Sequence, residues 1–200
     1  MSKVYCVKCR LLVSHCICAS RPECLTEKHW CLLMHPNEAN KRSNSGFHAK
    51  QLLGDYLNAV LWARKSETLA ADCAAEDGAE PVLLFPKAYV SDSVNVSEVY
   101  LADWHNRPLM ILDATWQQAR KMYRQSDWLQ LLDVWSLPEP QNDFFPDFEY
   151  QLRRNQTESG CSTIETIAYV MALTGELDSA RAMLKYFDLF QKDNNDPFHS

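Results

Sequence analysis

The cysteines near the N-terminus have the spacing of a metal site. Two close pairs lie within thirteen residues: Cys6, Cys9, Cys16 and Cys18. Zinc prefers such thiolate sets in tetrahedral geometry, and four protein ligands leave no open position for water. We therefore predict a structural zinc knuckle in residues 1–26 and keep two alternatives, His15 in place of one thiolate or a redox-active C-x-x-C.

A second candidate for chemistry is Asp113, which ends the apolar run 109–112. Such a run is typical of a buried strand in a parallel sheet. Thr115 can then cap a helix that begins at Trp116, with Gln118 as its capping-box partner. Asp113 would lie at the edge where open α/β sheets bind ligands. The alternative is that Asp113 only caps the helix.

Two further polar segments are predicted to precede helices. His35-Pro36 ends a strand over 29–34 and opens a polar loop. At the end of this loop, the amides of Ser43-Asn44-Ser45-Gly46 can bind an anion or a carboxylate. A second helix start, Gly160-Cys161-Ser162-Thr163 with Glu165 in its first turn, offers free amides in the same way.

The elements that must position these residues indicate an α/β fold with a mostly parallel sheet and flanking helices. The predicted strands cover 29–34, 59–63, 81–86, 109–112 and 133–137. The predicted helices cover 47–57, 99–106, 163–175 and 177–191, besides the one that begins at Trp116. Residues 66–80 form an acidic surface helix or loop, and the proline-rich stretch 137–149 is expected to be a lid or a wall.

The composition fits a globular protein with a proper core. Of its 200 residues, 46% are hydrophobic and 23% are charged. No apolar run reaches bilayer length and no signal-peptide segment stands at the start, so we expect a cytoplasmic location and reduced cysteines. The expected parts are the knuckle 1–26, a main domain 27–192 and a flexible tail 193–200. The other cysteines are expected to be buried small apolar residues: Cys24, Cys31, Cys73 and Cys161.

The net charge of −6 is unevenly distributed. Residues 1–65 hold ten Lys/Arg and four Asp/Glu, whereas residues 66–200 hold ten and twenty-two. A basic front half is compatible with a local nucleic-acid footprint, although an uneven surface without a partner has the same pattern. A glycine-rich phosphate loop and the dinucleotide motif G-x-G-x-x-G are both absent from the sequence.

Taken together, these motifs resemble the DTW-domain family, the tRNA-uridine aminocarboxypropyltransferases. The signature stands as Asp113-Ala-Thr115-Trp116, extended by Ala119-Arg120-Lys121-Met122. The motifs that accompany it in chain order are the cysteine knuckle, His35-Pro36-x-Glu38, Ser43-Asn44-Ser45-Gly46, Leu152-Arg153 and Ser162-Thr163-Ile164-Glu165. The resemblance covers residues 6 to about 175. Ser45, Cys161 and Thr166 replace the family's usual Thr, Leu and Ala.

The resemblance implies a SPOUT-like or Rossmann-like fold and a transfer reaction. S-adenosylmethionine would donate its 3-amino-3-carboxypropyl group to N3 of a tRNA uridine and leave as 5'-methylthioadenosine. The implied partners are tRNA and this donor, with structural zinc and neither a membrane nor an obligate protein partner. The implied catalytic residues are Asp113, Thr115 and Trp116. The implied donor-binding residues are His35, Glu38, Ser43, Asn44, Ser45, Gly46, Pro86, Leu112, Asp113, Arg153, Ser162, Thr163 and Glu165. The implied RNA contacts are Lys41, Arg42, Arg120, Lys121 and Arg124.

Several roles stay open at this point. Asp113 either takes the proton from uridine N3 or holds the ammonium of the donor, since both need an ionised carboxylate. Arg153 is expected to clamp the donor's carboxylate, and Trp116 either stacks on a base or belongs to the core. Two other functions remain: an RNA methyltransferase with the same donor, and a zinc-ribbon RNA-binding module without catalysis.

Overall fold

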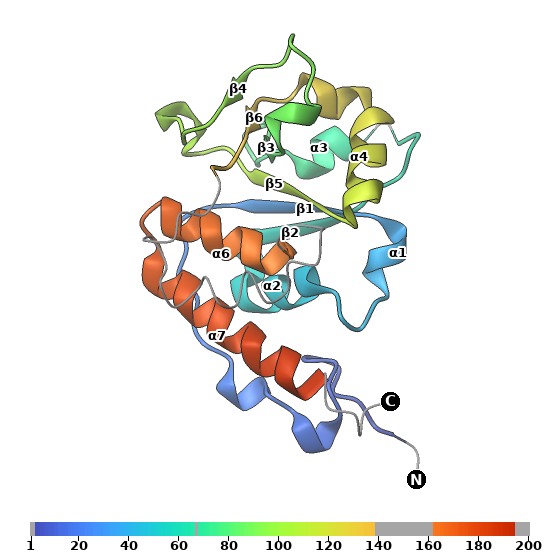
Figure 1. The fold of residues 1–200 in the computed structure, drawn as a ribbon, viewed down its shortest axis with the longest axis vertical. Helices are drawn as coiled ribbons and strands as arrows, with labels where there is room; N and C mark the ends of the chain where they lie inside the picture. Colours follow the sequence, from blue (N-terminus) through green and yellow to red (C-terminus); the bar gives the residue numbers. More distant parts are fainter. Residues whose placement is uncertain (1–2, 67, 139–161, 195–200) are drawn as a thin grey trace. The chain divides into compact units, whose positions relative to one another are not determined.

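A computed structural model describes residues 3–66, 68–138 and 162–194 of the chain (Figure 1). In these residues six strands form one sheet in the order β2-β1-β5-β3-β6-β4, and all its strand pairings are parallel. The strands are β1 (Trp30–Met34), β2 (Leu57–Leu61), β3 (Val82–Leu84), β4 (Val96–Ser97), β5 (Leu109–Asp113) and β6 (Val134–Trp135). The predicted α/β fold with a mostly parallel sheet is therefore confirmed.

By its internal contacts the chain divides into two compact units. The knuckle unit takes in residues up to 26, residues 41–54 and residues from 162 onward, and the sheet unit takes in residues 27–40 and 55–138 among those described. The predicted parts 1–26, 27–192 and 193–200 stay a prediction. Within the described segments, no helix combines the length and the apolar character that crossing a bilayer requires.

The two central strands of the sheet unit, β1 and β5, are apolar up to their carboxyl ends. Both are buried almost throughout, which is why they appear in the sequence as continuous apolar runs. They pair in register from Trp30 opposite Leu109 to Met34 opposite Asp113. Asp113 therefore lies at the carboxyl end of the sheet, as predicted from the sequence.

The core of the sheet unit lies against one face of the sheet. Helices α3 (Leu69–Cys73) and α4 (Trp116–Arg124) contribute to it, together with the 3-10 turn η6 (Asp127–Leu131). The buried residues of this core are Cys31, Leu33, Trp62, Leu69, Cys73, Leu83, Phe85, Met110, Leu112, Ala119, Met122, Tyr123, Leu129, Leu132 and Val134. The predicted burial of Cys31 and Cys73 is confirmed, as is that of Cys24 in the knuckle unit. Cys161 lies outside the described residues.

Helix α4 begins at Trp116 with the predicted capping box. The Oγ1 atom of Thr115 accepts a hydrogen bond from the Gln118 backbone N–H at 3.4 Å. In return, Gln118 Oε1 accepts from the Thr115 N–H at 2.9 Å. Two of the donors that a helix start leaves unpaired are thus satisfied, and the position of the helix after Asp113 is fixed locally.

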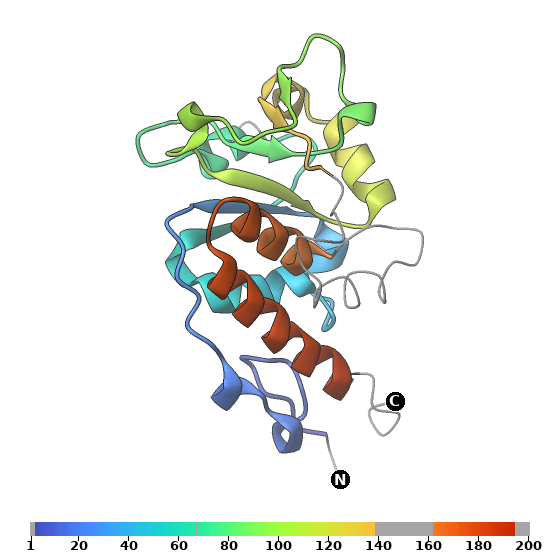
Figure 2. The ribbon, with the colours of Figure 1, turned by 60° about the vertical axis from the view of Figure 1, so that its left-hand side comes forward.

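The knuckle unit is built on three helices, α2 (Ser45–Leu53), α6 (Thr163–Leu173) and α7 (Leu177–Asn194). Helices α6 and α7 lie side by side in both views, and α2 contacts each of them (Figures 1 and 2). Gly175, at φ +94°, ends α6, and the Glu176 N–H bonds back to the Met171 carbonyl at 2.7 Å. A turn of this kind at a helix end favours glycine, because it requires a positive φ.

Several boundaries differ from the predicted ones. Helix α2 ends at Leu53, and not at residue 57, because Gly54 at φ +57° reverses the chain before β2 begins. Strand β4 was not predicted, since two residues carry no readable period. The helix predicted over 99–106 is only the 3-10 turn η5 (Ala102–Trp104), and α7 runs on to Asn194 into the predicted tail. The remaining short elements are α1 (Pro36–Ala39), η1 (Val13–His15), η2 (Cys18–Ser20), η3 (Gly54–Tyr56) and η4 (Lys87–Tyr89).

Candidate functional site

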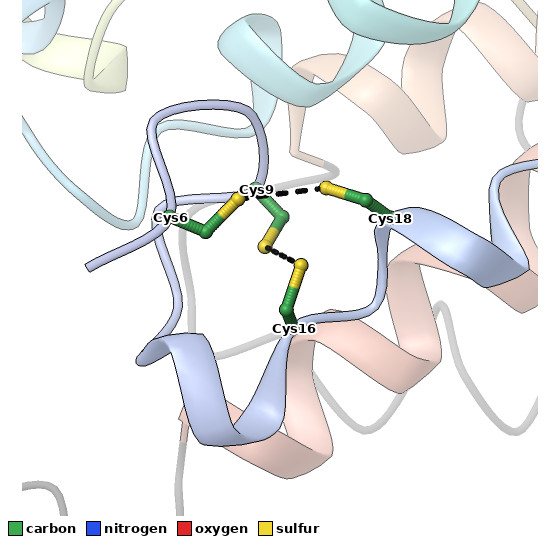
Figure 3. A group of neighbouring side chains, drawn as sticks. All are labelled: Cys6, Cys9, Cys16 and Cys18. Atoms are coloured by element: carbon green, nitrogen blue, oxygen red, sulfur yellow. Dashed lines mark hydrogen bonds between the residues drawn. The ribbon is translucent and has the colours of Figure 1, made fainter. Parts of the chain in front are cut away.

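The four N-terminal cysteines turn their thiols toward one centre (Figure 3). All four Sγ atoms lie within 4.8 Å of one another. Cys6 and Cys18 are 3.6 Å apart at sulfur, and Cys9 and Cys16 are 3.7 Å apart. A zinc ion with Zn–S bonds of about 2.3 Å requires tetrahedron edges of about 3.8 Å. The cluster therefore fits a closed, four-thiolate metal site, and His15 is not needed as a ligand.

Backbone hydrogen bonds fix the turn that carries Cys6 and Cys9. The Arg10 N–H donates to the Cys6 carbonyl at 2.8 Å, and Arg10 adopts a left-handed φ of +61°. The Cys6 N–H in turn bonds the Leu11 carbonyl at 2.8 Å. Backbone N–H groups of Cys9 and then Lys8 point at the Cys6 thiol and lower its pKa to about 6. The thiolate, which is the form that binds metals, is thereby favoured.

Two arginines connect the knuckle to the loop 41–47. Arg10 donates from Nη1 to the Lys41 carbonyl at 2.7 Å, and its Cζ lies 3.5 Å from the centre of the Phe47 ring. In the opposite direction, the Cζ of Arg42 lies 3.9 Å from the centre of the Tyr5 ring. This connection was not predicted from the sequence. No pattern in the sequence singles out Arg10, because its left-handed backbone is seen only in the structure.

The predicted donor-binding loop forms the start of α2. Asn44 is its N-cap, and Asn44 Oδ1 accepts from the Phe47 N–H at 2.5 Å. Asn44, Ser45 and Gly46 are buried, whereas Ser43 is exposed. The side chain of Asn44 is thus engaged by the helix itself, and the backbone amides of the first turn are the groups left for an anion or a carboxylate.

The second predicted helix start opens α6. The Ser162 N–H donates to Glu165 Oε2 at 2.8 Å, and Glu165 is buried. Thr163 is the first residue of α6. Because α6 contacts α2, the knuckle unit contains both helix starts on neighbouring helices. Arg153, the predicted carboxylate clamp, lies outside the described residues.

Asp113 occupies a switch point of the sheet. From β1 the chain continues to β2 on one side of the sheet, and from β5 it continues through α4 to β6 on the other side. Adjacent strands whose connections leave in opposite directions open a crevice at their carboxyl ends, which is where α/β sheets bind ligands. Asp113 is 3% exposed at this point. A carboxylate there must have polar partners, because burying it alone is costly.

The residues after β1 meet Asp113 at the same switch point. The His35 N–H donates to the Asp113 carbonyl at 3.0 Å, which extends the β1–β5 ladder by one bond. His35 also caps α1, where its Nδ1 accepts from the Asn37 N–H at 3.2 Å. Its ring stacks on Trp62 with centroids 5.7 Å apart. Glu38 lies in α1 and is buried. The sheet unit thus brings His35 and Asp113 together and holds Glu38 close behind His35.

The other predicted site residues of the sheet unit differ in their exposure to solvent. Thr115 is exposed and its hydroxyl caps α4. Pro86 is exposed directly after the strand region of β3. Leu112 is buried in the core. Trp116 packs against this core but stays partly exposed. Its ring is therefore partly a core residue, as one of the two alternatives for Trp116 stated.

The predicted RNA-contacting cations lie in both units and are all exposed: Lys41, Arg42, Arg120, Lys121 and Arg124. In the sheet unit three of them share helix α4, which contains no acidic residue. The residues of α4 that face the core are Ala119, Met122 and Tyr123. The basic side chains therefore occupy the outer side of this helix.

One buried titratable group of the knuckle unit was not singled out from the sequence. His48 in α2 is fully buried, and its ring centre lies 3.9 Å from that of Phe190. Burial, and then the charge of Arg10, lower the pKa of His48 to about 4. The imidazole is therefore neutral near pH 7 and serves as an aromatic core residue.

Comparison with protein families shows that a family model described as the DTW domain matches residues 3–194. No solved structure matches the chain. The family is that of the tRNA-uridine aminocarboxypropyltransferases, which modify tRNA. Because this family model matches nearly the whole chain, the protein belongs to the DTW-domain family of tRNA-modifying enzymes.

Proposed function

We propose that the protein transfers the 3-amino-3-carboxypropyl group of S-adenosylmethionine to N3 of a uridine in tRNA. The observation that carries this proposal is the buried carboxylate of Asp113 at the switch point of the sheet, beside the His35 turn. Family membership supplies the tRNA and the class of reaction. The finer points, the donor and the transferred group, come from the resemblance of the motifs.

The proposed reaction needs one base and one bond exchange. The donor supplies an electrophilic carbon, because its sulfonium leaves as a neutral thioether. Uridine N3 loses its proton and forms the N–C bond as the S–C bond breaks, so the products are the modified uridine, a proton and 5'-methylthioadenosine. Asp113 is the proposed acceptor of the N3 proton, and a positioned base of this kind contributes about 100- to 10,000-fold in rate.

A second role for Asp113 is to hold the ammonium of the donor. The carboxylate is 3% exposed, and a bound ammonium would compensate its charge in that site. The two roles predict different losses. A missing base lowers the rate of the chemical step, whereas a missing ammonium contact weakens the binding of the donor.

Other residues are proposed to position the two substrates. In the sheet unit, His35 and Glu38 accompany Asp113 on the donor. In the knuckle unit, the amides of 43–46 and of 162–163 are proposed for the donor's adenosine and methionine portions, with Arg153 on its carboxylate. Lys41, Arg42, Arg120, Lys121 and Arg124 are proposed to contact phosphates, which makes RNA affinity fall as salt rises.

The test is mass spectrometry of nucleosides from unmodified tRNA incubated with the protein and S-adenosylmethionine. Label in the aminocarboxypropyl group is expected in uridine, together with released 5'-methylthioadenosine. Label from the methyl group in RNA and S-adenosylhomocysteine as product would instead identify a methyltransferase. RNA binding without any labelled nucleoside would identify a binding module.

The Asp113→Asn variant tests the assigned residue. We expect loss of at least about 100-fold in turnover with little change in RNA affinity, because the amide keeps the shape but takes no proton. The control is Asp103→Asn, an exposed aspartate in η5 of the same unit. Full activity of Asp113→Asn would overturn both proposed roles of the carboxylate.

A further inference from the structure

Tyr89 is an aromatic side chain that remains open to solvent at the carboxyl end of β3. It is 42% exposed and ends η4, the turn that follows Phe85-Pro86. The ring of Trp116 meets it edge to face, with centroids 4.9 Å apart. Trp116 also packs on Phe85, which is buried and has its centroid 5.6 Å away. Tyr89 is thus the outer member of an aromatic stack that is rooted in the core.

A guanidinium lies over this exposed ring. The Cζ of Arg120 is 4.6 Å from the centroid of Tyr89, which is within the range of a cation–π contact. Arg120 is exposed, and among the described residues no carboxylate forms an ion pair with it. Within the described part of the chain, this positive charge has the ring as its neighbour and is available to an anionic ligand.

The charges around the pair have the same sign. Lys121 and Arg124 are exposed on α4 with Arg120, and this helix carries no acidic residue. These three cations stand out because residues 66–200 as a whole have twelve more acidic than basic side chains. An exposed aromatic ring, a guanidinium over that ring and two flanking cations are features that bind single-stranded nucleic acid. An acidic peptide would use the cations but would not need the planar pair.

We propose that Tyr89 and Arg120 form a stacking site for an unpaired base of the RNA, with Lys121 and Arg124 on the adjoining phosphates. The inference rests on the proposed function, since it names how that substrate is held. It also assigns the stacking role to Tyr89 in place of Trp116, because Trp116 supports Tyr89 from the core side. The site lies on the segments that follow β3 and β5, at the same edge of the sheet as Asp113.

The sequence offers a matched control for Tyr89. Tyr56 is 44% exposed and belongs to the same unit, but it directly precedes β2 and so lies at the amino ends of the parallel strands. Its ring neighbour is His29, at a centroid distance of 5.6 Å. Tyr56→Ala removes as much exposed aromatic surface at the opposite edge of the sheet.

The experiment measures the affinity of each variant for an unmodified tRNA transcript at two salt concentrations. We expect Tyr89→Ala to weaken binding about 5- to 100-fold with an unchanged salt slope, because a stacking contact is lost and a phosphate contact is not. Tyr89→Phe keeps the ring and is expected within about twofold of the wild type. Lys121→Ala is expected to lower the salt slope by about one. Tyr56→Ala is expected to bind as the wild type does.

Two results separate this inference from the proposed function. If Tyr89→Ala and Tyr89→Phe bind the transcript equally well while nucleoside modification proceeds, the stacking site is wrong and the proposed function stands. If the wild type neither binds nor modifies the transcript, the proposed function is wrong, and the stacking site that rests on it is wrong as well. Quenching of a 2-aminopurine placed in a single-stranded RNA, present for Tyr89→Phe and absent for Tyr89→Ala, reports the stacking directly.

Discussion

The knuckle unit and the sheet edge both gather residues predicted from the sequence, but contacts of different range hold them. At the sheet edge, Asp113 and Thr115 are positioned by the strand before them and the helix after them. In the knuckle unit, Arg10 reaches the Lys41 carbonyl and the Phe47 ring, more than thirty positions along the chain. The sheet edge is therefore encoded locally, whereas the knuckle depends on a few long-range side-chain contacts and on four cysteines that could hold a metal ion.

The largest expected effect is the loss of the metal. Cys9→Ser removes the most buried of the four thiols, and closed zinc sites contribute directly to the free energy of folding. We expect the variant to lose zinc and the amides of residues 5–18 to lose their protection from hydrogen exchange. Amides of β1 and β5 are expected to keep theirs, because the local rules of the sheet edge do not involve the metal. Elemental analysis and hydrogen exchange read both effects.

The control for this variant is Cys24→Ala in the same unit. Cys24 is buried, and its Sγ lies 3.9 Å from the Ser179 carbonyl, outside the four-cysteine cluster. The Cys24→Ala variant is expected to bind as much zinc as the wild type. If the amides of residues 5–18 in the wild type keep their protection from hydrogen exchange after treatment with a chelator, the knuckle does not need a metal to fold.

The sequence was sufficient to predict those features that depend on residues close to one another along the chain. The run 109–112, Asp113 and the Thr115 cap follow one another, so strand, site and helix could be predicted together. The cysteine spacing predicted the cluster for the same reason. Gly54 illustrates the limit, because its left-handed φ ends α2 early although the apolar pattern continues to residue 57.

The parts that could not be predicted depend on distant contacts. The order of the six strands and the two-residue β4 have no local signal. Neither have the Arg10–Phe47 and Arg42–Tyr5 contacts, since many aromatic rings in the chain were equally available to an arginine. The exposed position of Tyr89 beside Trp116 also could not be predicted, because it depends on a contact between η4 and α4, which are distant in the sequence.

A smaller effect is expected for the anchor Arg10. Arg10→Ala removes a charged hydrogen bond to the Lys41 carbonyl and a cation–π contact with Phe47, at a cost of about 2–3 kcal/mol. The φ of +61° adds a second comparison. Arg10→Gly loses the same contacts, but glycine adopts a left-handed backbone without steric cost. Arg10→Gly is therefore expected to be about 1 kcal/mol more stable than Arg10→Ala in chemical unfolding. Equal stability of the two variants would show that the turn relaxes when the side chain is removed.

The smallest effect compares the two helix caps, one from each region. Thr115 is exposed and bonds the Gln118 N–H at 3.4 Å, whereas Asn44 is 5% exposed and bonds the Phe47 N–H at 2.5 Å. Thr115→Ala is expected to cost about 1 kcal/mol, because water can replace the hydroxyl at an exposed helix start. Asn44→Ala is expected to cost about 2 kcal/mol, since it leaves a partly buried N–H unpaired.

Conservative variants separate the caps from other effects of these substitutions. Thr115→Ser and Asn44→Asp each keep an oxygen acceptor and are expected to retain most of the capping energy in chemical unfolding. If both alanine variants cost the same, burial does not distinguish the caps, and the start of α2 is as open to water as the start of α4. The first-turn amides of Ser45 and Gly46 would then be hydrated before any donor arrives, which weakens their case as a preformed anion site.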